Sequence, residues 1–87
     1  MLDLLKEKLA ALENATKAYR TKNSLAAWVY IDIAEYIARG KASRDFEKAW
    51  IAYPDEELPA LIERCLKGNM SCDGIIQTTK RMIGVQS

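Results

Sequence analysis

The stretch that decides the fold runs from Leu25 to Ala38 and reads LAAWVYIDIAEYIA. Asp32 and Glu35 are its only charged residues. A helix that is apolar over most of its circumference must be covered on several sides. Gly40 follows the stretch and suits the left-handed position just past a helix end. We therefore expect an all-α fold, a compact bundle of four to five helices in which the helix over residues 25–39 is central.

Residues 28–33 within this stretch, Trp-Val-Tyr-Ile-Asp-Ile, also have the strand propensity of aromatic and β-branched side chains. The alanines, the capped ends and the length of the stretch favour a helix instead. Its broad apolar face comprises Ala26, Val29, Tyr30, Ile33 and Ile37. Beside Ile31 lies a ridge of small residues, Ala27, Ala34 and Ala38, along which another helix can approach closely.

The N-terminal segment, Leu2 to about Lys22, has an apolar stripe at alternating spacings of three and four, which predicts a helix. The stripe comprises Leu2, Leu5, Leu9, Leu12, Thr16 and Tyr19. Asn23 or Ser24 can cap the helix that follows, so the connection is a short turn. We therefore expect the first two helices to pack as an antiparallel hairpin.

Three further amphipathic helices are expected over residues 44–52, 58–67 and 71–84. Each expected boundary has a residue that is typical of a helix end or a helix start. These residues are Ser43, Pro54, Pro59, Gly68, Ser71 and Gly84. The acidic run Asp55–Glu57 precedes the fourth helix, where negative charge complements the positive end of the helix dipole.

The chain has 87 residues, of which 49% are hydrophobic and 29% charged, as expected for a single helical domain over residues 1–87. Its net charge of +1 gives no general basic field, so nucleic-acid binding would need a local patch. No apolar run reaches the roughly 18–20 residues that cross a bilayer, and the N-terminal segment does not resemble a secretory signal. We expect a cytoplasmic protein without a membrane partner.

The composition argues against most enzyme chemistry. The chain has no histidine, so the commonest general base and the commonest metal ligand are both missing. Cys65 and Cys72 are too few for a zinc site, and both lie on apolar stripes, so we expect buried free thiols. Asp32 and Glu35 share one side of a helix, and Arg39 can neutralise them there. We therefore expect no catalytic residue, no metal and no cofactor.

Protein binding is the function that the pattern favours. Trp28 lies in the polar strip of the second helix, and Ile51 lies on a charged face of the third. Tryptophan and tyrosine are enriched at interface hot spots. The candidate interface residues are Trp28, Asp32, Glu35, Tyr36, Arg39 and Ile51. We expect a small adapter, regulator or inhibitor that binds a protein partner, with a homodimer as one form of that binding.

The alternative is a DNA-binding transcriptional regulator. If the first two helices are antiparallel, five cations meet at one pole of the bundle and can contact phosphates. They are Lys6, Lys8, Arg39, Lys41 and Arg44. The helix that would read the bases is the one expected over residues 44–52, and it has Asp45 and Glu47 near its start. Their carboxylates would repel the DNA phosphates there. This reading is therefore the weaker of the two.

Overall fold

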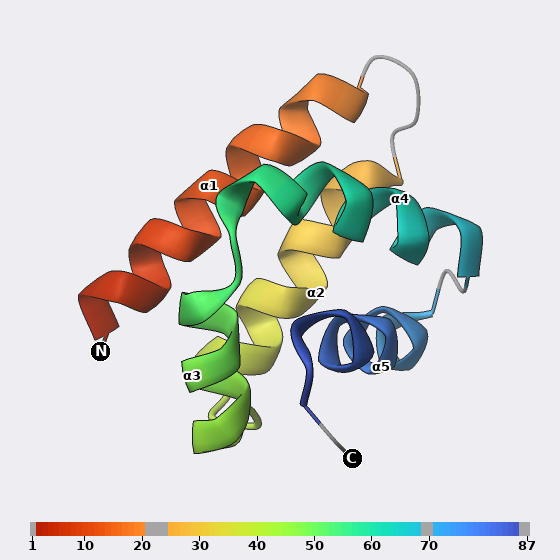
Figure 1. Cartoon of the computed structure of the whole chain (residues 1–87). Coiled ribbons are helices and arrows are strands. Elements are labelled where there is room, and N and C mark those ends of the chain that lie inside the picture. The colour runs from red at the N-terminus through yellow and green to blue at the C-terminus, as the bar shows by residue number, and fades with distance from the viewer. Residues whose placement is uncertain (1, 21–24, 69–70, 86–87) are drawn as a thin grey trace.

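The structure is a computed structural model and describes residues 2–20, 25–68 and 71–85. These residues form five α-helices and one short 3-10 helix, with no strand among them (Figure 1). The helices are α1 (Leu2–Arg20), α2 (Ala26–Ala38), α3 (Arg44–Ala52), η1 (Asp55–Glu57), α4 (Leu58–Gly68) and α5 (Cys72–Ile83). The all-α fold class is confirmed.

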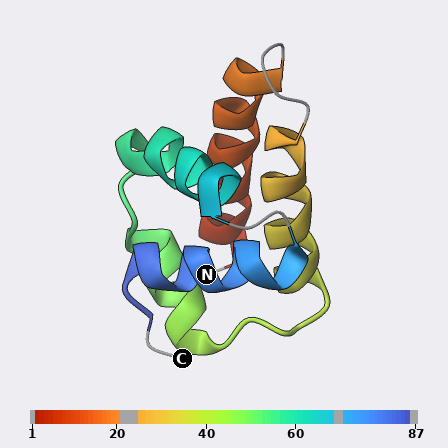
Figure 2. The same ribbon diagram turned by 90° about the vertical axis from the view of Figure 1, so that its right-hand side faces the viewer.

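The helices α1 and α2 lie side by side and run in opposite directions, as the hairpin prediction required (Figures 1 and 2). The predicted caps of the second helix, Asn23 and Ser24, lie outside the described residues. Helix α2 also packs against α4 and α5, so three helices cover parts of its surface. This places the Leu25–Ala38 stretch at the centre of the bundle.

The coverage of α2 is less complete than the sequence led us to expect. Ala26, Val29 and Ile33 are fully buried on the side that faces the other helices. On the opposite side Trp28 and Ile31 remain exposed. The reason is the size of the chain, because a domain of about this length buries only roughly 60% of the surface that its unfolded chain exposes.

The hydrophobic core draws on all five helices. Its largest members are Trp50, Phe46, Leu12, Ile33, Leu58, Leu61, Ile62 and Ile75. Trp50 lies within an aromatic row, 6.5 Å from Phe46 and 6.3 Å from Tyr53 between ring centroids. The rings of Tyr36 and Phe46 meet edge to face with their centroids 5.2 Å apart, so this row links α3 to α2.

The helix boundaries follow local residues closely. The hydroxyl of Ser43 accepts a hydrogen bond from the Phe46 amide, and that of Ser71 accepts one from the Gly74 amide, both at 3.1 Å. Gly40 has a φ angle of 73°, the left-handed geometry predicted for it, and Gly84, predicted to end the last helix, has a φ angle of 89°. Tyr53 ends α3 in an extended conformation before Pro54. Gly68 was predicted to lie just past the fourth helix, but it is the last residue of α4.

Candidate functional site

The exposed side of α2 is the largest departure from ordinary burial in the described chain. Trp28 is 53% exposed, Leu25 at the start of the helix is 42% exposed and Ile31 is 36% exposed. The ridge beside Ile31 is also accessible, because Ala38 is exposed and Ala27 and Ala34 are only half-buried. We call these residues together the α2 surface: Leu25, Ala27, Trp28, Ile31, Ala34 and Ala38.

A charged pair lies on the same side of α2 as Trp28. A guanidinium nitrogen of Arg39 lies 3.6 Å from a carboxylate oxygen of Glu35, one helical turn away, and both side chains are largely exposed. An exposed pair of this kind contributes little to stability. It makes part of this side of the helix polar but electrically neutral.

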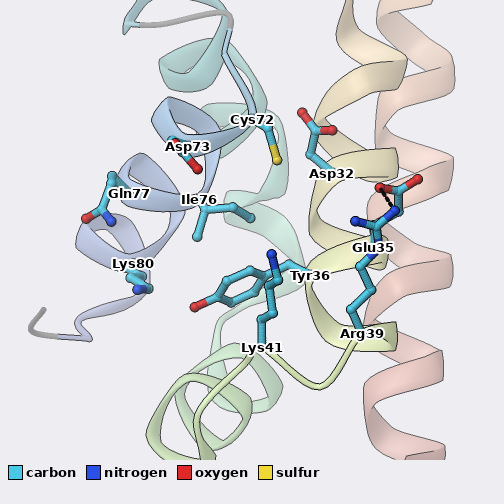
Figure 3. A pocket seen from close by; sticks show the side chains of 10 residues that line it. All are labelled: Asp32, Glu35, Tyr36, Arg39, Lys41, Cys72, Asp73, Ile76, Gln77 and Lys80. Atoms are coloured by element: carbon cyan, nitrogen blue, oxygen red, sulfur yellow. Dashed lines mark ion pairs between the residues drawn. The ribbon is translucent and has the colours of Figure 1, made fainter.

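Next to the α2 surface, α2 and α5 enclose an open cleft of about 160 Å³ (Figure 3). Four of the six interface candidates line it, namely Asp32, Glu35, Tyr36 and Arg39. The other lining residues are Lys41 from the loop after α2, and Cys72, Asp73, Ile76, Gln77 and Lys80 from α5. These four residues of α2 therefore form one wall of a concave site, and α5 forms the other wall.

One end of the cleft is acidic. Asp32 is half-buried, and the pKa of its carboxyl group is raised. The main cause is partial burial, and the second is the negative charge of the nearby Glu35 carboxylate. The Cys72 thiol donates a hydrogen bond to Asp32, which acts in the opposite direction. The pKa of the Cys72 thiol is also raised, chiefly by partial desolvation. The neighbouring carboxylates add to this effect, and they belong to Asp32, Asp73 and Glu35. The thiol is therefore protonated at neutral pH and is a poor nucleophile.

The prediction that both cysteines are buried is wrong for Cys72, which is exposed. Cys72 is the first residue of α5, and the covered part of that helix begins one turn later at Ile75. Cys65 is buried as predicted, and burial raises its pKa to about 11, against a hydrogen bond with Thr79 that lowers it. The periodic pattern identified the stripe but not where its covered part begins.

The other end of the cleft carries two ammonium groups. The Lys80 nitrogen lies 5.6 Å from the centre of the Tyr36 ring, the geometry of a cation–π contact. The side chain of Lys41 extends from the loop into the cleft (Figure 3). The prediction did not group Lys80 with Asp32, because no periodicity relates α5 to α2, and it assigned Lys41 to the basic pole.

Ile51 does not join the other interface candidates. It is half-buried against the core and lines a shallow groove with residues from α1 and from η1, which are Leu4, Glu7, Lys8 and Asp55. This groove has no lining residue in common with the α2–α5 cleft. Ile51 and Trp28 therefore belong to separate surfaces.

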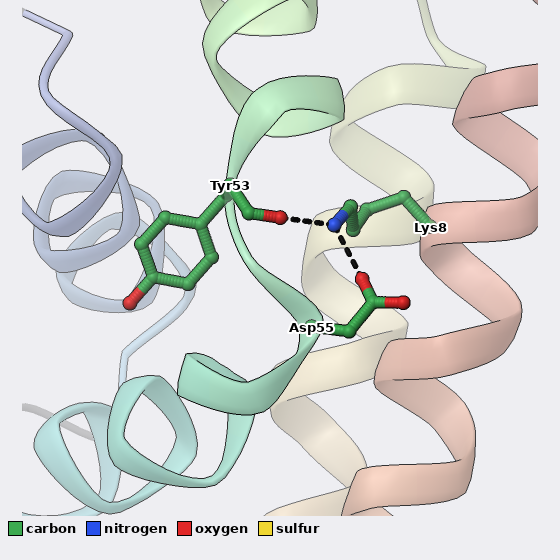
Figure 4. Close-up of polar contacts among 3 residues, drawn as sticks. All are labelled: Lys8, Tyr53 and Asp55. Carbon is green, nitrogen blue, oxygen red and sulfur yellow. Dashed lines mark hydrogen bonds and ion pairs between the residues drawn. The ribbon is translucent and has the colours of Figure 1, made fainter.

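The basic pole loses one of its five members. Lys8 is only 8% exposed, and its ammonium group donates to the Tyr53 carbonyl oxygen and pairs with Asp55 (Figure 4). Lys6, Arg39, Lys41 and Arg44 are exposed. A signal for the burial was present in the sequence, because Lys8 lies three residues after Leu5 and four before Leu12, on the core-facing stripe.

Comparison of the chain with protein-family models, with curated proteins and with solved structures found no match. Within residues 2–20, 25–68 and 71–85, no group of three or more cysteine, aspartate and glutamate side chains is arranged to hold a metal ion. None of the helices in these ranges is both long enough and apolar enough to span a membrane.

Proposed function

We propose that this chain is a non-enzymatic protein-interaction module that binds a helix of another protein through the α2 surface. The observation that carries the proposal is the exposure of Trp28 beside Leu25 and Ile31 on a helix whose opposite side lies in the core. Exposed aromatic and aliphatic side chains gathered in one place are typical of binding surfaces. A role as an adapter, a regulator or an inhibitor would follow from the partner that is bound.

A helix is the partner element that best fits the α2 surface. Ala27, Ala34 and Ala38 are small, so a second helix can approach α2 closely along this ridge. Ile31 projects within the ridge, and Trp28 flanks it as an aromatic anchor. A second copy of α2 offers the same combination, so a homodimer is the simplest form of the proposed interaction.

A cytoplasmic location is part of the proposal. Both cysteines of the chain are free thiols, and one of them is exposed to solvent. Free thiols persist in reducing compartments, whereas secreted domains of this size commonly use their cysteines in disulfides. The thiols thus support a reducing environment for the protein.

Sedimentation velocity over a range of concentrations tests the homodimer form. We expect Trp28→Glu and Ile31→Glu to weaken self-association by about tenfold or more, because a buried charge would face the partner helix. The matched control is Leu4→Glu, since Leu4 is 49% exposed but lies on α1. Equal effects of the three substitutions would contradict a specific role for the α2 surface.

If the wild-type chain remains a monomer at high micromolar concentration, the homodimer form is wrong and the partner is another protein. The same three variants then serve as baits, and the partner retained by the wild type and by Leu4→Glu should be lost with Trp28→Glu. A partner that binds all three variants equally overturns the proposal.

The DNA-binding alternative has less support. Burial of Lys8 removes one cation from the basic pole, and α3 has acidic residues, Asp45 and Glu47, in its first turn. Four exposed cations remain there, so the alternative still makes one clear prediction. Binding to duplex DNA would be detectable at low salt and would weaken steeply as salt is added.

A further inference from the structure

We propose that the cleft between α2 and α5 binds a small zwitterionic molecule, with the cationic group of the ligand at Asp32 and its carboxylate at Lys41 and Lys80. The inference rests on the side chains that line the cleft (Figure 3). Ligand binding in the cleft does not depend on protein binding at the α2 surface, so each of the two proposals can be tested without the other.

The acidic end of the cleft has a carboxylate without a cationic partner. Glu35 is paired with Arg39 at 3.6 Å. Among the described residues, no lysine or arginine lies within ion-pair distance of Asp32, whose hydrogen-bond partner is the thiol of Cys72. Asp32 has lost part of its hydration to burial, and a ligand ammonium group would supply the missing interaction.

The basic end has the opposite arrangement. Lys80 is half-buried with its ammonium group over the Tyr36 ring, and Lys41 extends from the loop into the same cleft. In the described part of the chain, no carboxylate lies within ion-pair distance of either lysine. Two ammonium groups that line one cleft and have no carboxylate partner among the described residues form a suitable site for a ligand carboxylate.

The two ends are joined by an apolar middle. The Ile76 side chain lies between Asp32 and Lys80, and the Tyr36 ring lies beneath Lys80 at the basic end (Figure 3). They can contact the carbon chain of a ligand whose charges lie at its ends. The cavity of about 160 Å³ limits such a ligand to a small molecule.

The charge balance of the lining selects a zwitterion over a simple anion or cation. Three carboxylates, Asp32, Glu35 and Asp73, and three cationic side chains, Arg39, Lys41 and Lys80, line the cleft, and among them Glu35 and Arg39 pair with each other on α2. An anion that binds the lysines gains nothing at the acidic end, and a cation gains nothing at the basic end. A molecule with both charges interacts favourably with both ends, which is how electrostatic complementarity produces specificity.

The test is a chemical-shift titration of the full-length, isotopically labelled protein with glycine, 4-aminobutanoate and 6-aminohexanoate. Hexylamine and hexanoate are the probes that carry one charge only. We expect at least one of the three zwitterions to bind with a dissociation constant of about 1 mM or lower, with shifts confined to the cleft. It should bind about tenfold more tightly than either probe with a single charge.

Two variants test the orientation of the ligand. Asp32→Asn should weaken the zwitterion about tenfold and leave hexanoate unchanged, whereas Lys80→Gln should weaken the zwitterion and leave hexylamine unchanged. Asp45→Asn and Lys48→Gln on exposed positions of α3 are the matched controls. Thermal unfolding verifies that all four variants remain folded.

The proposal is overturned if none of the three zwitterions gives saturable shifts. It is equally overturned if the probes with one charge bind as tightly, or if Asp32→Asn and Lys80→Gln behave like the α3 controls. Trp28→Ala, which introduces no charge one turn from Asp32, should leave zwitterion binding unchanged, so a failure of the α2 surface as a docking site can be distinguished from a failure of the cleft.

Discussion

The two tryptophans of the chain occupy opposite environments. Trp50 on α3 is fully buried between Phe46 and Tyr53, whereas Trp28 on α2 is 53% exposed and outside the core. The same contrast recurs for the two thiols, Cys65 and Cys72. One set of side chains holds the bundle together, and the other lies at the surfaces proposed for binding. Stability and binding should therefore respond to different substitutions.

The largest effect is expected at the buried tryptophan. Trp50→Ala should lower the free energy of unfolding by about 3–5 kcal/mol, because it leaves a cavity in the centre of the core. This is a large fraction of the roughly 5–15 kcal/mol that stabilises a typical domain. Urea denaturation measures the change, and a loss below about 1 kcal/mol would mean that the core collapses readily around the smaller side chain.

The buried lysine provides the second test. Lys8→Ala should cost about 1–2 kcal/mol, chiefly because the Tyr53 carbonyl oxygen loses its hydrogen-bond donor. Asp55 adds little to this cost, since its side chain is largely exposed and returns to water. Lys6→Ala is the control, because Lys6 is exposed on the same helix. Equal unfolding midpoints for the two variants would contradict a structural role for Lys8.

The buried thiol predicts a loss of stability at high pH. Burial raises the pKa of Cys65 from 9.0 to about 11, so between these values the unfolded chain loses a proton that the folded chain keeps. Unfolding is thereby favoured, by about 1 kcal/mol at pH 10. Comparison of Cys65→Ala with the wild type at pH 7 and at pH 10 isolates this contribution. A difference between the two proteins that does not change with pH would contradict it.

The exposed thiol should respond to the charge of the cleft. Cys72 should react with iodoacetamide in the folded protein while Cys65 does not. Because nearby carboxylates raise the pKa of Cys72, Asp32→Asn should lower that pKa and speed the reaction severalfold near pH 8. Mass spectrometry follows each thiol, and Asp45→Asn is the control. An unchanged rate would show that Asp32 does not influence the thiol.

The smallest effect on stability is expected at the exposed tryptophan. Trp28→Ala should change the free energy of unfolding by no more than about 0.5 kcal/mol, as is usual for surface positions. The measurement is the same urea denaturation as for Trp50→Ala. A cost near that of the Trp50 variant would remove the distinction between the two environments.

Local features of the structure could be predicted from the sequence because their causes are local. The caps at Ser43 and Ser71 and the left-handed geometry of Gly40 depend on residues within one helical turn. The Glu35–Arg39 pair follows from spacing alone. For the same reason Asp32, Glu35, Tyr36 and Arg39 could be recognised as one side of a helix.

Features that join distant parts of the chain could not be predicted in the same way. The cleft exists only because α5 packs against α2, which brings Lys80 and Cys72 to the strip that contains Asp32. Similarly, Lys8 can be buried only because Tyr53 and Asp55, 45 and 47 residues later, supply its partners. Periodicity shows which residues share a face, but it does not show which other element faces them.

The Lys8 contact also fixes the axial position of α1. The apolar stripe of this helix is repetitive, since Leu5, Leu9 and Leu12 recur at helical spacing. A slide of α1 by one or two turns would replace one leucine with another and would cost little apolar burial. It would also separate the Lys8 ammonium group from the Tyr53 carbonyl oxygen, leaving a buried charge without a partner. A single polar contact thus distinguishes the native register from slipped alternatives that leucine packing alone would tolerate.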